Sequence, residues 1–210
     1  AVPFTLVTLW QNLKLPILAL TPQPEAARNL YEQLVLWSGK DERVLHFPET
    51  ETLPFERLVS DINTTHRRLR TLSVLTDGHK RTPIVVASAA AVAQKTIDRE
   101  VFTTSTHTLQ LNQRVDVNEL LNQWQKMGYQ FKPAVYSPGL VSRRGGILDI
   151  FPLGSSLPAR IELWGNEINS IRLFDPATQR STDMVDSITI IPAQEALTGL
   201  TDHAHLDRLV

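Results

Sequence analysis

Residues 159–164 read Ala-Arg-Ile-Glu-Leu-Trp, so small or aliphatic side chains alternate with polar or aromatic ones. Successive side chains of a β-strand point to opposite faces, which places Ile161 and Leu163 on one face and Arg160 and Trp164 on the other. We assign the first face to a hydrophobic core. The other face carries an arginine and a tryptophan, two residue types that are enriched at the energetic centres of protein interfaces. The strand therefore predicts a sheet with one buried face and one face suited to docking.

A second interpretation of this strand needs no docking partner. Trp164 would pack under a neighbouring loop, and Arg160 would pair with Glu162. Single exposed apolar residues are common on folded proteins and need no functional explanation. The sequence alone leaves both interpretations open.

Similar strand signals occur on both sides of this segment. Runs of strand-forming residues that end in turn residues predict further strands at residues 109–111, 146–151, 167–174 and 187–191. One helix is expected at residues 116–127, because its apolar side chains form one stripe and Gly128 follows as a C-cap. The second half of the chain is therefore predicted to be an α+β domain, in which one helix packs against an antiparallel sheet.

The strand at residues 146–151 is the expected hairpin partner of the strand at residues 159–164. We assume a register in which Ile150 opposes Arg160, so that Gly146 opposes Trp164. Arg144 would then lie beside Trp164 on the same face. A glycine opposite a large ring leaves the ring accessible and permits a bulge or a close approach.

The first half of the chain alternates strand and helix signals. Short apolar runs predict strands at residues 15–20, 43–47 and 84–87, and helical spacing predicts a helix at residues 25–37. A second helix is expected after the N-cap Asp61, with inward-facing side chains at Ile62, Leu69, Leu72 and Leu75. Strands that alternate with helices indicate an α/β domain with a parallel three-layer sheet.

The change between these two patterns falls at residues 103–106, a polar stretch without periodicity. We predict an α/β domain at residues 1–104, an α+β domain at residues 105–194, and a segment at residues 195–210 that begins a return to the first domain. Because Ala1 stands where a methionine would start a gene product, we expect a piece of a longer protein.

The composition limits the classes of function. The 210 residues are 42% hydrophobic and 20% charged, as in ordinary globular proteins. No apolar run approaches the roughly 20 residues of a membrane span, and no secretory signal precedes the first strand, so we expect a cytoplasmic protein without a membrane partner. The absence of cysteine excludes disulfides and thiolate metal sites. A net charge of -1 gives no global attraction to nucleic acid.

Three segments resemble a known family. Residues 144–152 (Arg-Gly-Gly-Ile-Leu-Asp-Ile-Phe-Pro), 160–164 and 173–176 (Leu-Phe-Asp-Pro) are similar to the stretch shared by the excision-repair protein UvrB and the transcription-repair coupling factor. Weaker similarity in residues 16–34, 52–55 and 84–93 extends the resemblance over nearly the whole chain.

The resemblance implies a partner and three site residues. In this family the small α+β domain binds UvrA, and the matching positions here are Arg144, Arg160 and Trp164. The family usually has phenylalanine at the last of these positions, and tryptophan keeps a large flat side chain there. The first half would be a degenerate domain of the P-loop ATPase type.

Two sequence features favour the coupling-factor branch over UvrB. The chain has no Gly-x-x-x-x-Gly-Lys-Ser/Thr phosphate loop. UvrB also carries a tyrosine-rich hairpin that grips DNA, whereas residues 49–61 contain no tyrosine. The resemblance then implies a non-catalytic adaptor without a cofactor or small-molecule substrate, while ATP, RNA polymerase and DNA act through other regions of the parent protein. The alternative is a nucleotide-dependent DNA-processing domain of UvrB or helicase type, whose phosphate loop would precede Ala1.

Other candidate sites are weaker. Arg67, Arg68 and Arg70, with His66 and Arg57 nearby, would form either a solvated helix face or a contact with DNA phosphates. The pair His203 and His205 lacks the i,i+4 spacing that directs two imidazoles to one metal ion, so no metal site is expected. No motif for a nucleophile or for paired carboxylates indicates catalysis.

Overall fold

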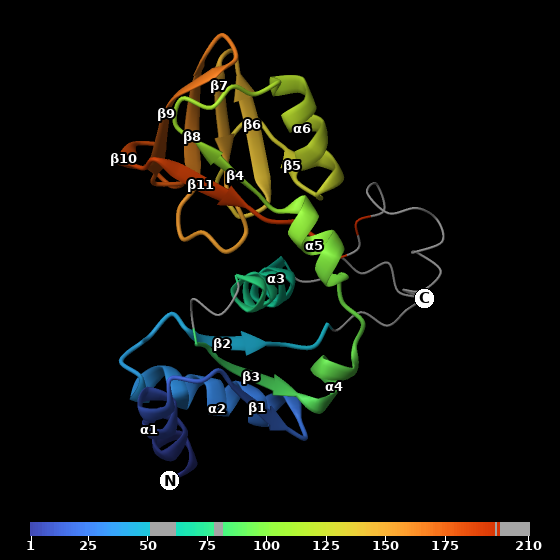
Figure 1. Cartoon of the computed structure of the whole chain (residues 1–210), viewed down its shortest axis with the longest axis vertical. Helices are drawn as coiled ribbons and strands as arrows, with labels where there is room; N and C mark the ends of the chain where they lie inside the picture. The colour runs from blue at the N-terminus through green and yellow to red at the C-terminus, as the bar shows by residue number, and fades with distance from the viewer. Residues whose placement is uncertain (51–61, 78–81, 196, 198–210) are drawn as a thin grey trace. The chain divides into compact units, whose positions relative to one another are not determined.

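The computed structural model describes residues 1–50, 62–77, 82–195 and 197 of the chain (Figure 1). The chain divides into two compact units, Ala1–Thr96 and Ile97–Val210. The second unit begins with helix α5 (Arg99–Ser105), so residues 103–105 are helical rather than an aperiodic link. This helix forms because Asp98 caps it, accepting hydrogen bonds from the backbone of Glu100 and Val101, and because Phe102 is buried.

The first unit is built on a three-stranded sheet. The strands are β1 (Ile17–Thr21), β3 (Ile84–Ser88) and β2 (Val44–Phe47), paired in parallel in the order β1-β3-β2. All of β3 is buried, as its consecutive apolar residues predict for a central parallel strand. The predicted strands and their parallel pairing are confirmed.

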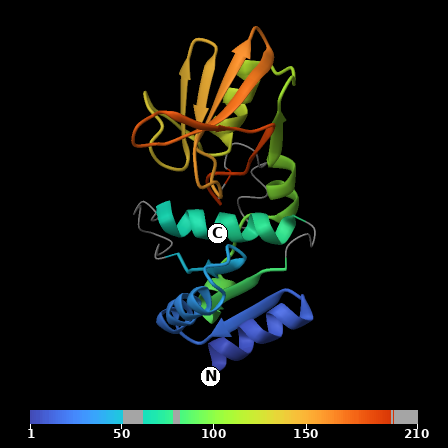
Figure 2. The same ribbon diagram turned by 90° about the vertical axis from the view of Figure 1, so that its left-hand side faces the viewer.

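Helices lie on both faces of this sheet (Figure 2). Helix α1 (Val2–Leu13) and helix α2 (Pro24–Trp37) lie on one face, where Val7, Trp10 and Leu34 are part of the core cluster. Helix α3 (Ile62–Thr76) lies on the other face, and the short helix α4 (Ala89–Ala93) follows β3. The sequence pattern predicted α2 and α3 but not α1.

The inward positions predicted for α3 are right at its centre and wrong at its ends. Leu69 is fully buried, whereas Ile62 and Leu75 are exposed. A helix of this length spans about 22 Å, while a strand as short as β2 covers only about 13 Å. The sheet therefore has too little surface to cover the two ends of the helix.

The second unit contains a six-stranded sheet in the order β10-β9-β8-β7-β6-β5. Its strands in chain order are β5 (Gln130–Phe131), β6 (Leu140–Arg144), β7 (Ile147–Ile150), β8 (Ala159–Trp164), β9 (Glu167–Phe174) and β10 (Ser181–Met184). All neighbours are antiparallel except β5 and β6. Strands β4 (His107–Gln110) and β11 (Ser187–Ile190) form a separate antiparallel pair. The sequence predicted β8 and β9 at their observed bounds and did not predict β5, β6 or β10.

One face of this sheet is covered by helix α6 (Val117–Lys126) and the β4–β11 pair. Trp124 from α6 is completely buried, and Ile161 and Ile171 are among the sheet residues of the same cluster. Asp116 caps α6 by accepting hydrogen bonds from the backbone of Asn118 and Glu119. The chain is thus a mixed α and β protein, and α5 adds a second helix to a unit for which one was predicted.

Candidate functional site

The β7–β8 hairpin decides which residues share the face opposite α6. Ile150 opposes Ala159, and Asp149 opposes Arg160. The assumed register, with Ile150 opposite Arg160, is therefore wrong by one residue. A slip by one residue moves every side chain of a strand to the other face, and here it would match the core residue Ile150 with a charged guanidinium. Gly146 consequently lies against Leu163, whose N–H donates to the Gly146 carbonyl at 2.8 Å.

The observed register places one set of charged and aromatic side chains on the face away from α6. We call this surface the outer face, and its members are Arg144, Asp149, Arg160, Glu162, Trp164 and Arg172. The strands alternate as the sequence predicts, because Ile161 and Leu163 pack in the core while their neighbours in β8 point outward.

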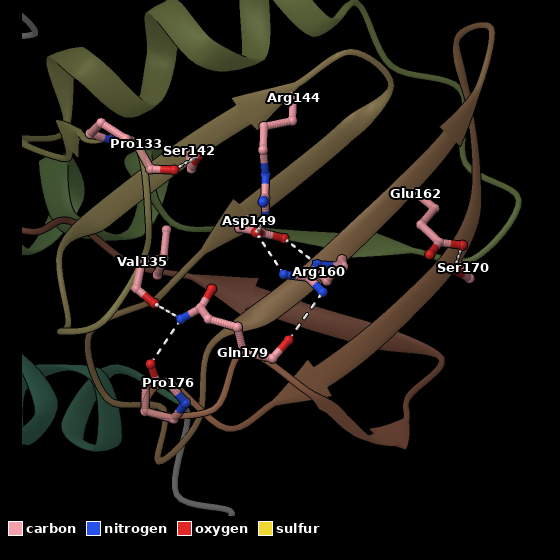
Figure 3. Close-up of polar contacts among 10 residues, drawn as sticks. All are labelled: Pro133, Val135, Ser142, Arg144, Asp149, Arg160, Glu162, Ser170, Pro176 and Gln179. Atoms are coloured by element: carbon pink, nitrogen blue, oxygen red, sulfur yellow. Dashed lines mark hydrogen bonds and ion pairs between the residues drawn. The ribbon is translucent and has the colours of Figure 1, made fainter.

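Asp149 is the centre of the outer face (Figure 3). Its carboxylate is only 1% exposed and binds two guanidinium groups. Arg160 donates from Nε to Oδ1 at 2.7 Å and from Nη2 to Oδ2 at 2.9 Å. Arg144 donates from Nη2 to Oδ2 at 2.7 Å. These are short, charge-assisted bonds, and the fork of Arg160 is bidentate.

Sequence reasoning named Arg144 and Arg160 but missed the aspartate that joins them. The available signal was a carboxylate within the apolar run Ile147-Leu148-Asp149-Ile150. A charge inside a strand with a buried face needs a partner of opposite sign. The two arginines on neighbouring strands supply it.

Arg160 is held from several sides. Its Nη1 donates to the carbonyl of Gln179 at 3.3 Å, and its guanidinium carbon lies 4.8 Å from the ring centroid of Phe174. Gln179 is itself fixed, because its side-chain amide donates to the carbonyls of Val135 and Pro176 (Figure 3). The pKa of Arg160 is raised above its ordinary value, chiefly by the hydrogen bonds to Asp149. Arg160 therefore stays charged.

Trp164 is the most accessible large apolar side chain of the described residues, with 83% of its surface exposed. It does not pack under a loop, and Arg160 pairs with Asp149 rather than with Glu162. Glu162 instead accepts a hydrogen bond from Ser170 and lies 3.7 Å from Arg172. The structure thus contradicts both parts of the alternative interpretation of this strand.

Arg144 and Trp164 share the outer face without being direct neighbours. Arg144 opposes Ile147, which in turn opposes Glu162. Trp164 is one outward-facing position farther along β8 than Glu162. The prediction that Arg144 lies directly beside Trp164 is therefore wrong, and its cause is the slipped register.

Comparison with known proteins matches this sheet to a known domain family. The family model of the UvrB interaction domain matches residues 108–195, which include all six strands. A transcription-repair-coupling factor of Bacillus subtilis is 37% identical over 158 residues, which cover 75% of this chain and 13% of that protein. The protein of the same name from Myxococcus xanthus is 33% identical over 202 residues, 94% of this chain and 17% of that protein. In Escherichia coli the identity is 28% over 180 residues, 86% of this chain and 15% of that protein.

The chain belongs to the transcription-repair coupling factor family. It spans between 13% and 17% of the length of these three relatives. The resemblance inferred from residues 144–152 and 160–164 is confirmed.

In this member of the coupling factor family, the basic cluster on α3 is divided by burial. Arg68 is fully buried, with its guanidinium carbon 4.1 Å from the ring centroid of Phe47 and its Nη1 donating to the Pro48 carbonyl at 2.8 Å. Arg67 is exposed, and Arg70 is partly buried. The expected run of three accessible arginines is wrong at Arg68, because this side chain packs towards the sheet.

Several predictions for this coupling factor fragment fall on residues outside the described ranges. They concern Asp61, Arg57, the turn at residues 52–55, the pair His203 and His205, and the return segment. In the part of the chain that the structure describes, no three His, Asp or Glu residues form a possible metal site. No helix of these residues is long and apolar enough to cross a membrane.

Proposed function

We propose that the outer face binds UvrA and thereby recruits the nucleotide-excision-repair machinery to a transcription-repair coupling factor. One observation carries the proposal: the domain that matches the UvrB interaction domain exposes 83% of a tryptophan on the same sheet face as two arginines that are held by Asp149. Exposed aromatic and arginine side chains are the residue types that dominate binding energy at protein interfaces.

The shape of the outer face supports docking rather than catalysis. Trp164 is at the tip of a hairpin, where a flat ring can enter a pocket of the partner. Arg144 stands on the neighbouring hairpin with a 57% exposed side chain. A phenylalanine at position 164 would keep the flat anchor, so we expect Trp164→Phe to retain most of the affinity.

The affinity of the 210-residue chain for purified UvrA tests this function. Arg144→Ala should weaken binding by about 2 kcal/mol, or roughly 30-fold. Arg28→Ala is the matched control, because Arg28 is a 71% exposed arginine of the first unit that pairs only with Glu32 among the described residues. Equal binding of UvrA by the parent chain and Arg144→Ala would show that the surface is misassigned.

We also propose that the fragment has no catalytic activity and binds no cofactor. The first unit resembles a degenerate P-loop ATPase domain in its parallel β1-β3-β2 sheet between helices, and the phosphate-loop sequence is absent from the chain. ATP hydrolysis, DNA translocation and RNA polymerase binding would belong to other regions of a cytoplasmic parent protein. Calorimetric titration with Mg-ATP should give no binding heat. Saturable binding would favour the alternative, a nucleotide-dependent DNA-processing domain.

A further inference from the structure

The two arginines that bind Asp149 differ in how far they are exposed to a partner. The side chain of Arg144 is 57% exposed, whereas that of Arg160 is 17% exposed. Building on the proposed function, we propose that Arg144 and Trp164 contact UvrA directly, that Asp149 and Arg160 are positioning residues for Arg144, and that the group received by Arg144 is a carboxylate.

The guanidinium of Arg160 is engaged in contacts within its own domain. Each of its three guanidinium nitrogens donates a hydrogen bond within the domain, two of them to Asp149 and one to the Gln179 carbonyl. Its flat side lies against the ring of Phe174. Only 17% of its side chain is exposed, so a partner has little access to it, and its place in the site is to complete the structure around Asp149.

Arg144 is held at one point and open elsewhere. Its Nη2 bonds to Oδ2 of Asp149, and this is its only ion pair among the described residues. The same oxygen also accepts from Nη2 of Arg160. Asp149 therefore holds the guanidinium of Arg144 through Nη2, while its Nε and Nη1 donate to no other described residue. Ordering a long side chain before binding reduces the entropy that docking must remove.

The charges of the three residues indicate the chemistry of the partner. Arg144 and Arg160 contribute two positive charges and Asp149 one negative charge, which leaves one net positive charge. Because Asp149 and Arg160 are largely buried against each other, the surplus is on the exposed Arg144. A guanidinium with free donors matches a carboxylate in geometry and charge. We therefore assign an acidic side chain of UvrA to Arg144.

Asp149→Asn separates positioning from simple electrostatic attraction, because the two explanations predict opposite changes in the affinity for UvrA. The substitution adds one positive charge to the outer face. Attraction alone would make binding to an acidic partner tighter. Positioning predicts affinity about tenfold weaker, since Arg144 loses its anchor. In the double variant Asp149→Asn/Arg144→Ala, the loss should be clearly smaller than the product of the single losses.

The experiment measures the affinity of the full 210-residue chain for purified UvrA at two salt concentrations, with thermal unfolding as the check on folding. If Asp149→Asn does not fold, Arg160→Lys replaces it, because lysine keeps the charge but cannot form the bidentate pair. This variant should also bind about tenfold more weakly and be non-additive with Arg144→Ala. Higher salt should weaken UvrA binding by the parent chain more than UvrA binding by Arg144→Ala.

Three distinguishable outcomes would contradict the proposed function, the positioning role or the acidic partner group. Failure of the parent chain to bind UvrA removes the proposed function and this inference together. Equal or tighter binding by Asp149→Asn, or additive losses in the double variant, removes the positioning role while the proposed function stands. Equal salt dependence of the parent and Arg144→Ala removes the acidic partner group.

Discussion

Arg144 and Trp164 occupy equivalent positions in two hairpins of the same sheet. Arg144 ends β6 and pairs with Ile147 across a two-residue loop, and Trp164 ends β8 and pairs with Glu167 in the same way. In both loops the first residue is a glycine with φ of 61°. Since β6 and β8 run in the same direction, both side chains reach the same end of the sheet. The two tight turns thus set the spacing of the docking residues.

At Gly145, the effect of a substitution on stability should depend only on how well the new residue adopts a left-handed backbone conformation. A Cβ at Gly145 would meet no atom within 4 Å, but its φ of 61° is left-handed. Gly145→Ala should lower the free energy of unfolding by about 1 kcal/mol. Gly145→Asn should lower it less, because asparagine tolerates this conformation. Urea unfolding compares the three proteins, and an alanine variant as stable as the parent would contradict the assignment.

Two tryptophans of the second unit should differ sharply in their effect on stability. Trp124 is fully buried and donates from Nε1 to Nε2 of His107 at 3.0 Å, whereas Trp164 is 83% exposed. Trp124→Ala should lower the free energy of unfolding by about 3–5 kcal/mol. Trp164→Ala should change it by no more than about 0.5 kcal/mol. A large loss of stability in Trp164→Ala would mean that its ring packs within the domain.

The first turn of α6 depends on Asp116. Its carboxylate accepts hydrogen bonds from Asn118 N–H at 2.9 Å and Glu119 N–H at 3.0 Å. Asp116→Ala should lower the free energy of unfolding by about 1 kcal/mol, and Asp116→Ser should restore most of it. Thermal or urea unfolding measures the difference, and no rescue by serine would argue against capping.

His46 should make the first unit sensitive to mild acid. Burial, with help from Arg67 and Arg28, lowers its pKa from 6.5 to about 4. The unfolded chain therefore takes up a proton at a higher pH than the folded chain does. The free energy of unfolding should be highest above pH 6.5 and should fall as the pH drops from 6.5 towards 4.

His46→Phe is the matching variant, because a phenyl ring can keep the stacking on Tyr31. Its stability should fall less between pH 7 and pH 4 than that of the parent. Burial also lowers the pKa of His66, so part of the acid sensitivity should remain. Identical pH profiles of the parent and His46→Phe would exclude this role.

How far the sequence predicts the fold depends on which signal each element carries. The bounds of β8 and β9 follow from alternation and from the glycine turn between them. The pairing register does not, because the loop between β7 and β8 admits more than one alignment. The observed alignment is the one that keeps Ile150 and Ile161 in the core and brings Asp149 against Arg160 across the hairpin.

Strand β6 and the burial of Arg68 were not predicted, because the sequence carries no periodic signal for either. Strand β6 ends in Arg143 and Arg144, which interrupt any apolar pattern. Arg68 is a charged residue in a helix next to two other arginines, and nothing in this pattern predicts that its guanidinium packs on the ring of Phe47. By contrast, the exposure of Trp164 could be expected, because alternation places it opposite the core residues of its strand.

The most direct measurement compares two exposed tryptophans in their effect on UvrA binding. Trp164 is 83% exposed on the outer face, and Trp37 is 58% exposed at the end of α2 in the first unit. Trp164→Ala should weaken the affinity of the chain for UvrA by about 2 kcal/mol, roughly 30-fold, while Trp37→Ala should leave it unchanged. Equal affinities of Trp164→Ala and Trp37→Ala would contradict the assignment of the outer face as the docking surface.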